Sequence, residues 1–111
     1  MSVIPFHRPR ESHIEQFFTA KAEKAGYVVL KFSPAGRRGY PDRVVLGRPR
    51  SGRENMYYGR VLFVEFKRPG EKLRALQVAR HDDLVQRGYQ VAVVDSREKA
   101  IALLRMIGCT A

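Results

Sequence analysis

Apolar residues change their spacing along the chain, and each spacing predicts a different element. Between residues 12 and 25 they recur every three or four positions, which is the period of an amphipathic helix, and Gly26 follows as a stop. Four short runs are rich in β-branched and aromatic residues, which is typical of strands, at residues 27–32, 42–46, 60–66 and 90–94. Helical spacing returns at residues 73–87 and 97–107. The order α-β-β-β-α-β-α predicts an α/β fold with a mixed central sheet flanked by helices.

Other sequence features predict how these elements begin, where one strand lies in the sheet, and how two strands are connected. The segment Ser12-His13-Ile14-Glu15 fits a capping box at the start of the first helix. The run at residues 90–94 is continuously apolar, so we expect that strand to be central and buried. We expect residues 1–10 to form an N-terminal arm and residues 11–111 to form a single domain. Residues 47–59 are polar and basic, and they predict a long hairpin connection with a mobile tip.

The net charge of the chain limits which kinds of molecule are expected to bind it. Its 111 residues include 21 Lys and Arg against 11 Asp and Glu, which is a formal net charge of +10. Such an excess destabilises a compact state unless a polyanion binds, and nucleic acid is the leading candidate. An anionic membrane is disfavoured because no segment combines a cationic face with a broad, aromatic-rich apolar one.

The number of cysteines, the spacing of the histidines and the length of the apolar runs exclude other classes of protein. Cys109 is the only cysteine, so an internal disulfide framework and a cysteine-based zinc site are excluded. The three histidines are separated and lack metal-ligand spacing, and we do not expect them to be ligands. No apolar run approaches the length of a membrane span, and the first residues do not resemble a signal peptide. We therefore expect a soluble cytoplasmic protein.

Three charged residues stand at the ends of apolar runs, where a charge is costly unless it has a partner. Asp42 begins the second predicted strand, and Glu65 and Lys67 end the third, two residues apart and so on one face. Antiparallel pairing of these strands brings Asp42 and Glu65 to the same edge. Two carboxylates there suit Mg²⁺ or Mn²⁺, with water and a substrate phosphate as further ligands. Lys67 then either deprotonates the attacking water or stabilises charge on the phosphate.

Structural interpretations of the same charges stay open. Asp42 can simply begin a strand after a turn, and Glu65 with Lys67 can form an ion pair on an edge strand. On the first helix we favour Glu15 as a further carboxylate of the site, although Glu11 lies one turn earlier on the same edge.

Basic residues around these charges are candidates for contact with a phosphate backbone. They lie in the loop before Asp42, in the strand residues next to that loop, and in the segment after the third predicted strand. Tyr40 is added because its ring can stack on a base or pack on a dimer partner. The predicted nucleic-acid-binding residues are Lys31, Arg37, Arg38, Tyr40, Arg43, Arg68 and Lys72.

Four features occur together in the expected elements. They are Glu15, Gly39-Tyr40-Pro41-Asp42-Arg43, Val64-Glu65-Phe66-Lys67-Arg68-Pro69-Gly70 and Gln77. With these features the chain, from about residue 11 to residue 96, resembles the VRR-NUC nucleases of the PD-(D/E)XK superfamily. The resemblance implies a restriction-endonuclease-like core. It also implies roles for six residues: metal ligands Asp42, Glu65 and the Phe66 carbonyl, catalytic Lys67, helix carboxylate Glu15 and supporting Gln77.

The resemblance also sets the expected activity. Small stand-alone relatives are similar to Holliday junction resolvases, so we expect a Mg²⁺- or Mn²⁺-dependent DNA endonuclease that cleaves four-way junctions as a homodimer. The alternatives are a flap, nicking or general duplex endonuclease, or a DNA-binding module without catalysis. We expect neither a membrane nor a nucleotide cofactor among its partners.

Overall fold

The computed structural model describes residues 10–49 and 59–109. Its elements, in order, are α1 (Glu11–Lys24), β1 (Val28–Lys31), β2 (Arg43–Gly47), β3 (Arg60–Phe66), α2 (Ala75–Gln86), β4 (Gln90–Val94) and α3 (Arg97–Met106). This order is the predicted one. Residues 1–9 of the predicted arm and residues 50–58 of the predicted hairpin tip lie outside the described residues.

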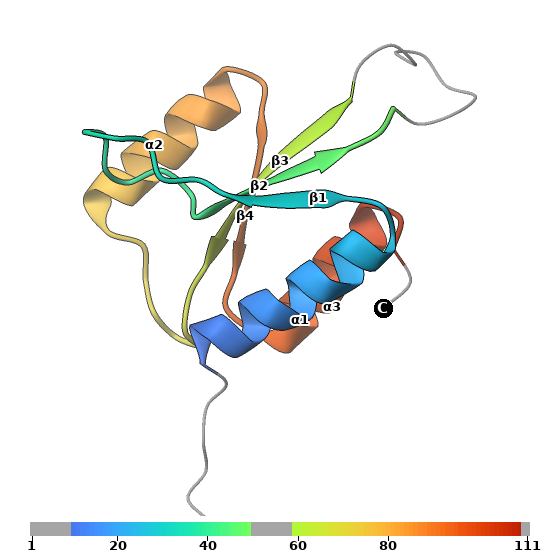
Figure 1. Cartoon of the computed structure of the whole chain (residues 1–111). Coiled ribbons are helices and arrows are strands. Elements are labelled where there is room, and N and C mark those ends of the chain that lie inside the picture. The colour runs from blue at the N-terminus through green and yellow to red at the C-terminus, as the bar shows by residue number, and fades with distance from the viewer. Residues whose placement is uncertain (1–9, 50–58, 110–111) are drawn as a thin grey trace, which may run out of the picture.

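The four strands form one mixed sheet in the order β1-β2-β3-β4 (Figure 1). The pairs β1–β2 and β2–β3 are antiparallel, whereas β3–β4 is parallel. A parallel pair needs a crossover connection, and α2 lies in it. In the β2–β3 hairpin Arg43 pairs with Val64. Asp42, one residue earlier, therefore lies beside Glu65 at the end of the hairpin, which confirms the prediction for this pair of strands.

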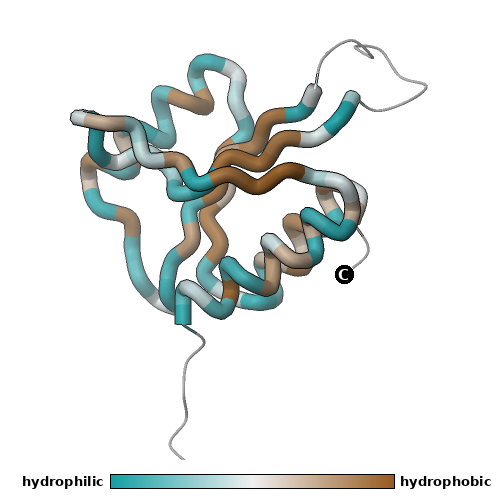
Figure 2. Tube along the Cα trace, in the orientation of Figure 1, coloured by the Kyte–Doolittle hydropathy of each residue, from teal (hydrophilic) through white to brown (hydrophobic). Residues whose placement is uncertain are grey.

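Alternation of side chains gives the two faces of the sheet different partners. Val45 and Val64 point toward α1 and α3 and join the apolar core there. Phe63 and Glu65, the neighbours of Val64 in β3, point to the opposite face, where α2 covers part of the sheet (Figure 1). Figure 2 shows that the strands between these helical layers are the most apolar part of the trace. Glu65 therefore faces α2 and not α1.

The helices bury the stripes that their spacing predicts. In α1 the buried residues are Ile14, Phe18 and Ala22, spaced four apart on one side of the helix. Phe18 meets Phe66 of β3 edge-on, with ring centroids 5.6 Å apart. Within residues 10–49 and 59–109, no helix combines the length and the apolar content that crossing a membrane would require.

The prediction of a central, buried β4 is wrong. This strand is at the edge of the sheet, next to β3 alone, and only Val94 among its residues is fully buried. Its apolar run has another cause, because α2 packs on β4 from one face of the sheet and α3 from the other. Two covered faces select apolar residues at every position, even on an edge strand.

The predicted capping box at Ser12 is also wrong. The N-cap of α1 is Arg10, whose backbone is extended and whose side chain makes no capping bond. The Arg10 carbonyl accepts hydrogen bonds from the N–H groups of His13 and Ile14, at 3.0 and 3.2 Å. Ser12 is therefore already inside the first turn, where its hydroxyl does not occupy the N-cap position. Glu11 in that turn suits the positive end of the helix dipole.

Candidate active site

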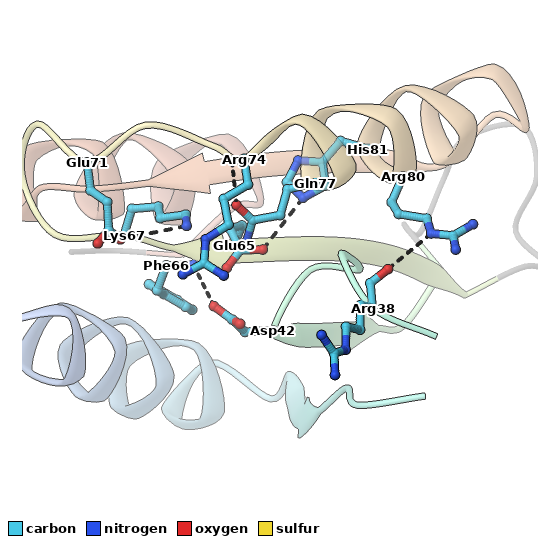
Figure 3. Close-up of polar contacts among 10 residues, drawn as sticks. All are labelled: Arg38, Asp42, Glu65, Phe66, Lys67, Glu71, Arg74, Gln77, Arg80 and His81. Carbon is cyan, nitrogen blue, oxygen red and sulfur yellow. Dashed lines mark hydrogen bonds and ion pairs between the residues drawn. The ribbon is translucent and has the colours of Figure 1, made fainter. Parts of the chain in front are cut away.

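Asp42 lies at the point where the chain enters β2. It follows Pro41, whose side chain is fully buried and whose ring restricts the backbone before the strand. Its Oδ2 atom accepts a hydrogen bond from the Phe66 N–H of β3, at 3.1 Å (Figure 3). This bond holds the carboxylate of Asp42 against the end of β3, next to Glu65.

Glu65 is an acid with almost no access to solvent. The residue is 2% exposed, and its Oε1 atom has no hydrogen-bond partner in the part of the chain that the structure describes. Burial, followed by hydrogen bonding to Asp42 and the charge of Asp42, raises the pKa of Glu65 to about 9. Two adjacent carboxylates therefore either retain a proton or require a cation beside them.

Lys67 follows directly after β3 and is 7% exposed. Its backbone N–H donates to the Val94 carbonyl at 2.9 Å, which continues the parallel pairing of β3 with β4 by one step. Its Nζ atom lies 3.7 Å from Oε1 of Glu71 (Figure 3). The ammonium group is thus held at the same end of the sheet as the two carboxylates, as the sequence predicts.

The two acids of α1 have different surroundings. Glu15 forms an ion pair and hydrogen bond with Arg43. Arg43 is the neighbour of Asp42 in the chain, so the two side chains point to opposite faces of the sheet. Glu11 interacts instead with the site: burial raises its pKa, and the charges of Asp42 and Glu71 raise it further. Glu11 is therefore the acid of α1 whose charge interacts with Asp42, whereas Glu15 is paired with Arg43, and the choice of helix carboxylate stays a prediction.

Helix α2 contributes a residue that sequence patterns did not single out. His81 is 6% exposed, and its Nε2 atom lies 3.6 Å from Oε1 of Glu65 (Figure 3). Burial lowers the pKa of His81. Gln77, four residues earlier, accepts a hydrogen bond from the Arg74 N–H at 2.8 Å and so caps the start of α2. The spacing from Gln77 to His81 was the available signal, because residues four apart share one face of a helix.

The loop before Asp42 is packed against α2. Gly39 has a φ of +89°, and a Cβ atom there would lie 2.9 Å from Leu76 Cγ and 3.0 Å from the Leu76 carbonyl oxygen. A larger residue would therefore meet both steric contact and backbone strain. Arg80 donates from Nε to the Arg38 carbonyl at 3.1 Å and lies over the Tyr40 ring, 5.1 Å from its centroid. These contacts fix the loop beside the carboxylates.

The predicted nucleic-acid-binding residues fall into two groups around this centre. Arg37 and Arg38 are exposed and line a cavity of about 670 Å³ together with Tyr40 and Asp42. Arg68 lines a separate cavity of about 400 Å³, together with residues of α1. Lys31 and Lys72 are exposed, whereas Arg43 forms an ion pair with Glu15.

The donor set fits a hard divalent cation. Within the described residues, no group of three His, Cys, Asp or Glu side chains is arranged to hold a metal ion. Asp42 and Glu65 instead supply two adjacent carboxylates, and Glu65 has an unpartnered oxygen. Mg²⁺ commonly binds through one or two carboxylates and keeps several waters. The pair therefore suits Mg²⁺ better than a metal that needs a complete protein cage.

Comparison with known proteins identifies the family of the chain. The model of the VRR-NUC domain family matches residues 6–98. The chain belongs to the VRR-NUC domain family. Its members are nucleases of the PD-(D/E)XK superfamily, so this VRR-NUC domain is a nuclease, and its α/β fold is the one that the sequence predicts.

Three relatives of this VRR-NUC domain illustrate the match. The chain is 38% identical over 89 residues to "Putative nuclease p44" of Acyrthosiphon pisum secondary endosymbiont phage 1, covering 80% of this chain and 86% of that protein. A solved structure described as a VRR_NUC domain matches with a TM-score of 0.71 and 28% identity, over 86% of this chain and 94% of that one. Another, a VRR_NUC domain protein, matches with a TM-score of 0.65 and 19% identity, over 89% of this chain and 88% of that one, and shows the shared fold.

Proposed function

We propose that this nuclease is a DNA endonuclease that uses Mg²⁺ or Mn²⁺ bound by Asp42 and Glu65. The observation that carries the proposal is the pair of adjacent carboxylates, of which Asp42 is half-buried and Glu65 is buried with an unpartnered oxygen and a pKa raised to about 9. A divalent cation would stabilise both carboxylates in their charged form. When bound, it would activate a water and withdraw charge from the phosphate.

The protein residues supply the other parts of the proposed reaction. Asp42, held by the Phe66 N–H, and Glu65 present their oxygens from neighbouring strands, and the Phe66 carbonyl remains the predicted third protein ligand. Lys67 lies at the same end of the sheet, where its neutral amine accepts a proton from water or, alternatively, its ammonium form stabilises charge on the phosphate. Gln77 supports the site indirectly, since it caps the helix that packs over Glu65.

The charge distribution supports DNA as the substrate. The net charge is +10, and exposed basic residues flank the carboxylates in two groups, Arg37 with Arg38 and Arg68 with Lys72. They precede Asp42 and follow Glu65 in the chain, so both carboxylates have exposed basic residues nearby in the chain, which suits binding of a phosphate backbone at the site. Tyr40 is half-buried between Phe32 and Arg80, so its proposed contact with DNA uses only the part of its ring that remains exposed.

We propose four-way junctions as the preferred DNA and a homodimer as the active form. Each chain carries one pair of metal-binding carboxylates, so two symmetric nicks at one junction require two chains. Helix α2 covers only part of one face of the sheet. The uncovered part of that same face offers a surface for the second copy. There Val28, Leu30 and Leu46 are 51%, 47% and 36% exposed, and Val28 pairs with Leu46 across β1 and β2.

Cleavage of matched substrates tests this proposal. End-labelled four-way junction, flap, nicked duplex and linear duplex of one sequence are incubated with the protein in Mg²⁺, Mn²⁺ or EDTA. We expect paired symmetric nicks on the junction with either metal and none with EDTA. Cleavage of all four substrates would support the alternative of a general duplex endonuclease. Tight binding without cleavage in any metal would leave only a DNA-binding module, and a monomer in sedimentation at micromolar concentration would contradict the dimer.

The two acids of α1 give a second test. We expect Glu11→Gln to weaken Mn²⁺ binding and slow cleavage by roughly 10- to 100-fold, the usual effect of losing an outer group of a metal site. Glu15→Gln should have a smaller effect on cleavage, because its partner Arg43 points to the other face of the sheet. Loss of that partly exposed ion pair should instead cost about 0.2–1 kcal/mol of stability.

Cleavage rates at saturating DNA and thermal unfolding separate these effects. A loss of cleavage in Glu15→Gln that exceeds the loss in Glu11→Gln would return the role of helix carboxylate to Glu15.

A further inference from the structure

His81 lies within the candidate site but is not needed to complete the carboxylate pair. It is 6% exposed, and neither Nδ1 nor Nε2 has a hydrogen-bond partner among the described residues. The oxygen of Glu65 nearest to it, Oε1, is unpartnered as well, and the two atoms are 3.6 Å apart. A buried donor and a buried acceptor that lack other partners cost folding free energy unless they form a hydrogen bond with each other.

The position of His81 is set by contacts on both sides of it. Gln77 caps the start of α2, and Leu84, one turn after His81, is buried against the sheet. Arg80 binds the Arg38 carbonyl in the neighbouring loop. With α2 fixed at these points, the imidazole is directed at β3, and Figure 3 shows its ring above the carboxylate of Glu65. No rotation of the helix is needed to bring the two groups together.

We infer that His81 is a positioning residue: it donates an N–H from Nε2 to Oε1 of Glu65 and thereby aims the other oxygen of Glu65 at the metal. The inference rests on the proposed metal site. A separation of 3.6 Å is longer than a hydrogen bond, and catalytic hydrogen bonds often shorten only in the reactive complex. Groups that orient a metal-binding carboxylate in this way typically change metal affinity by 10- to 100-fold.

Two substitutions separate orientation from packing. His81→Gln keeps an N–H donor on a side chain of similar reach, whereas His81→Leu keeps the apolar bulk without a donor. Leu84→Val is the matched control, because it loosens the packing of α2 one turn away without touching Glu65. Mn²⁺ affinity is measured without DNA, from the electron paramagnetic resonance signal of free Mn²⁺, and thermal unfolding is recorded for each protein.

We expect His81→Leu to weaken Mn²⁺ binding by roughly 10- to 100-fold, His81→Gln to restore most of the affinity, and Leu84→Val to lower the unfolding temperature with Mn²⁺ affinity unchanged. Equal affinity in His81→Leu and the wild type would overturn the inference. Equal loss in His81→Leu and His81→Gln would also overturn it, because a donor in place of the imidazole would then be without effect.

A further variant distinguishes failure of this inference from failure of the proposed function. If Glu65→Gln binds Mn²⁺ as tightly as the wild type, the metal site itself is wrong. If Glu65→Gln loses binding while His81→Leu keeps it, the metal site stands and only the role of His81 is rejected.

Discussion

Replacement of Asp42 with Ala, or of Glu65 with Gln, should lower the rate of DNA cleavage by at least about 10³-fold. A metal ion contributes several kcal/mol to stabilising the transition state, and each 1.4 kcal/mol is about tenfold in rate. Affinity for DNA in EDTA should stay the same or increase in Asp42→Ala, because a negative charge close to a phosphate is removed, and should stay the same in Glu65→Gln, because Glu65 already holds a proton there. Single-turnover cleavage of a four-way junction and binding in Ca²⁺ or EDTA measure the two effects separately.

Asp83→Ala is the matched control for these variants. Asp83 is an acid of α2 whose partner is Arg87 at 2.9 Å, a largely exposed pair at the far end of the helix from Arg74. Its removal also raises the net charge by one unit, so it reproduces the general electrostatic effect on DNA binding. Turnover at the wild-type rate in Asp42→Ala would show that the carboxylate pair is not the metal site.

The charge of Glu65 gives an independent measurement on the metal-free protein. Its pKa is about 9 in the folded chain against an ordinary value of 4.5, so between these values the folded state binds a proton that the unfolded state does not. Stability in EDTA should therefore fall as the pH rises from about 5 to about 9. Glu65→Gln cannot ionise, and at about pH 8 it should unfold at a higher temperature than the wild type.

Replacement of Lys67 with Ala should slow cleavage by roughly 10²- to 10³-fold, the usual effect of removing one group that stabilises transition-state charge. Mn²⁺ affinity should be preserved, since Lys67 is not a proposed ligand and its nearest acid is Glu71. Single-turnover rates at saturating DNA, together with Mn²⁺ binding without DNA, separate chemistry from assembly of the site.

Lys67→Arg distinguishes the two roles that the sequence leaves open for this residue. Arginine keeps the positive charge but does not release a proton in proteins. A rate well above that of Lys67→Ala assigns charge stabilisation, whereas an equal loss assigns proton transfer. Lys72→Ala is the control, because it removes an exposed cation from the same segment and should affect DNA binding more than the cleavage rate.

The main features of the fold follow from local patterns in the sequence. Helical and strand spacing alone predict seven elements in the observed order, and the hairpin of β2 and β3 brings Asp42 beside Glu65 as expected. The errors arise where a local pattern has two causes. The apolar run of β4 reflects helices on both of its faces and not a central place in the sheet. The Ser12 pattern fits an N-cap, but the observed N-cap is Arg10, two residues earlier.

The residues of the candidate site were likewise only partly predictable from the sequence. Asp42, Glu65 and Lys67 are recognisable from the sequence because charges at the ends of apolar strands are costly without partners. The spacing of Glu65 and Lys67, two residues apart at the end of one strand, is also a local property. Helical spacing places Glu11 and Glu15 on one edge of α1 but does not say which of them reaches the ends of the strands. The choice depends on Arg43, which takes Glu15 to the other face of the sheet.

The sequence by itself determined the order of the elements, the positive charge and the pair of carboxylates with a lysine. These features depend on residue type and on spacing within a strand or helix. Only the tertiary structure shows that Glu15 of α1 pairs with Arg43 and that His81 lies against Glu65. Both depend on how a helix is rotated and which face of the sheet it covers, and packing between segments distant in the chain sets that geometry.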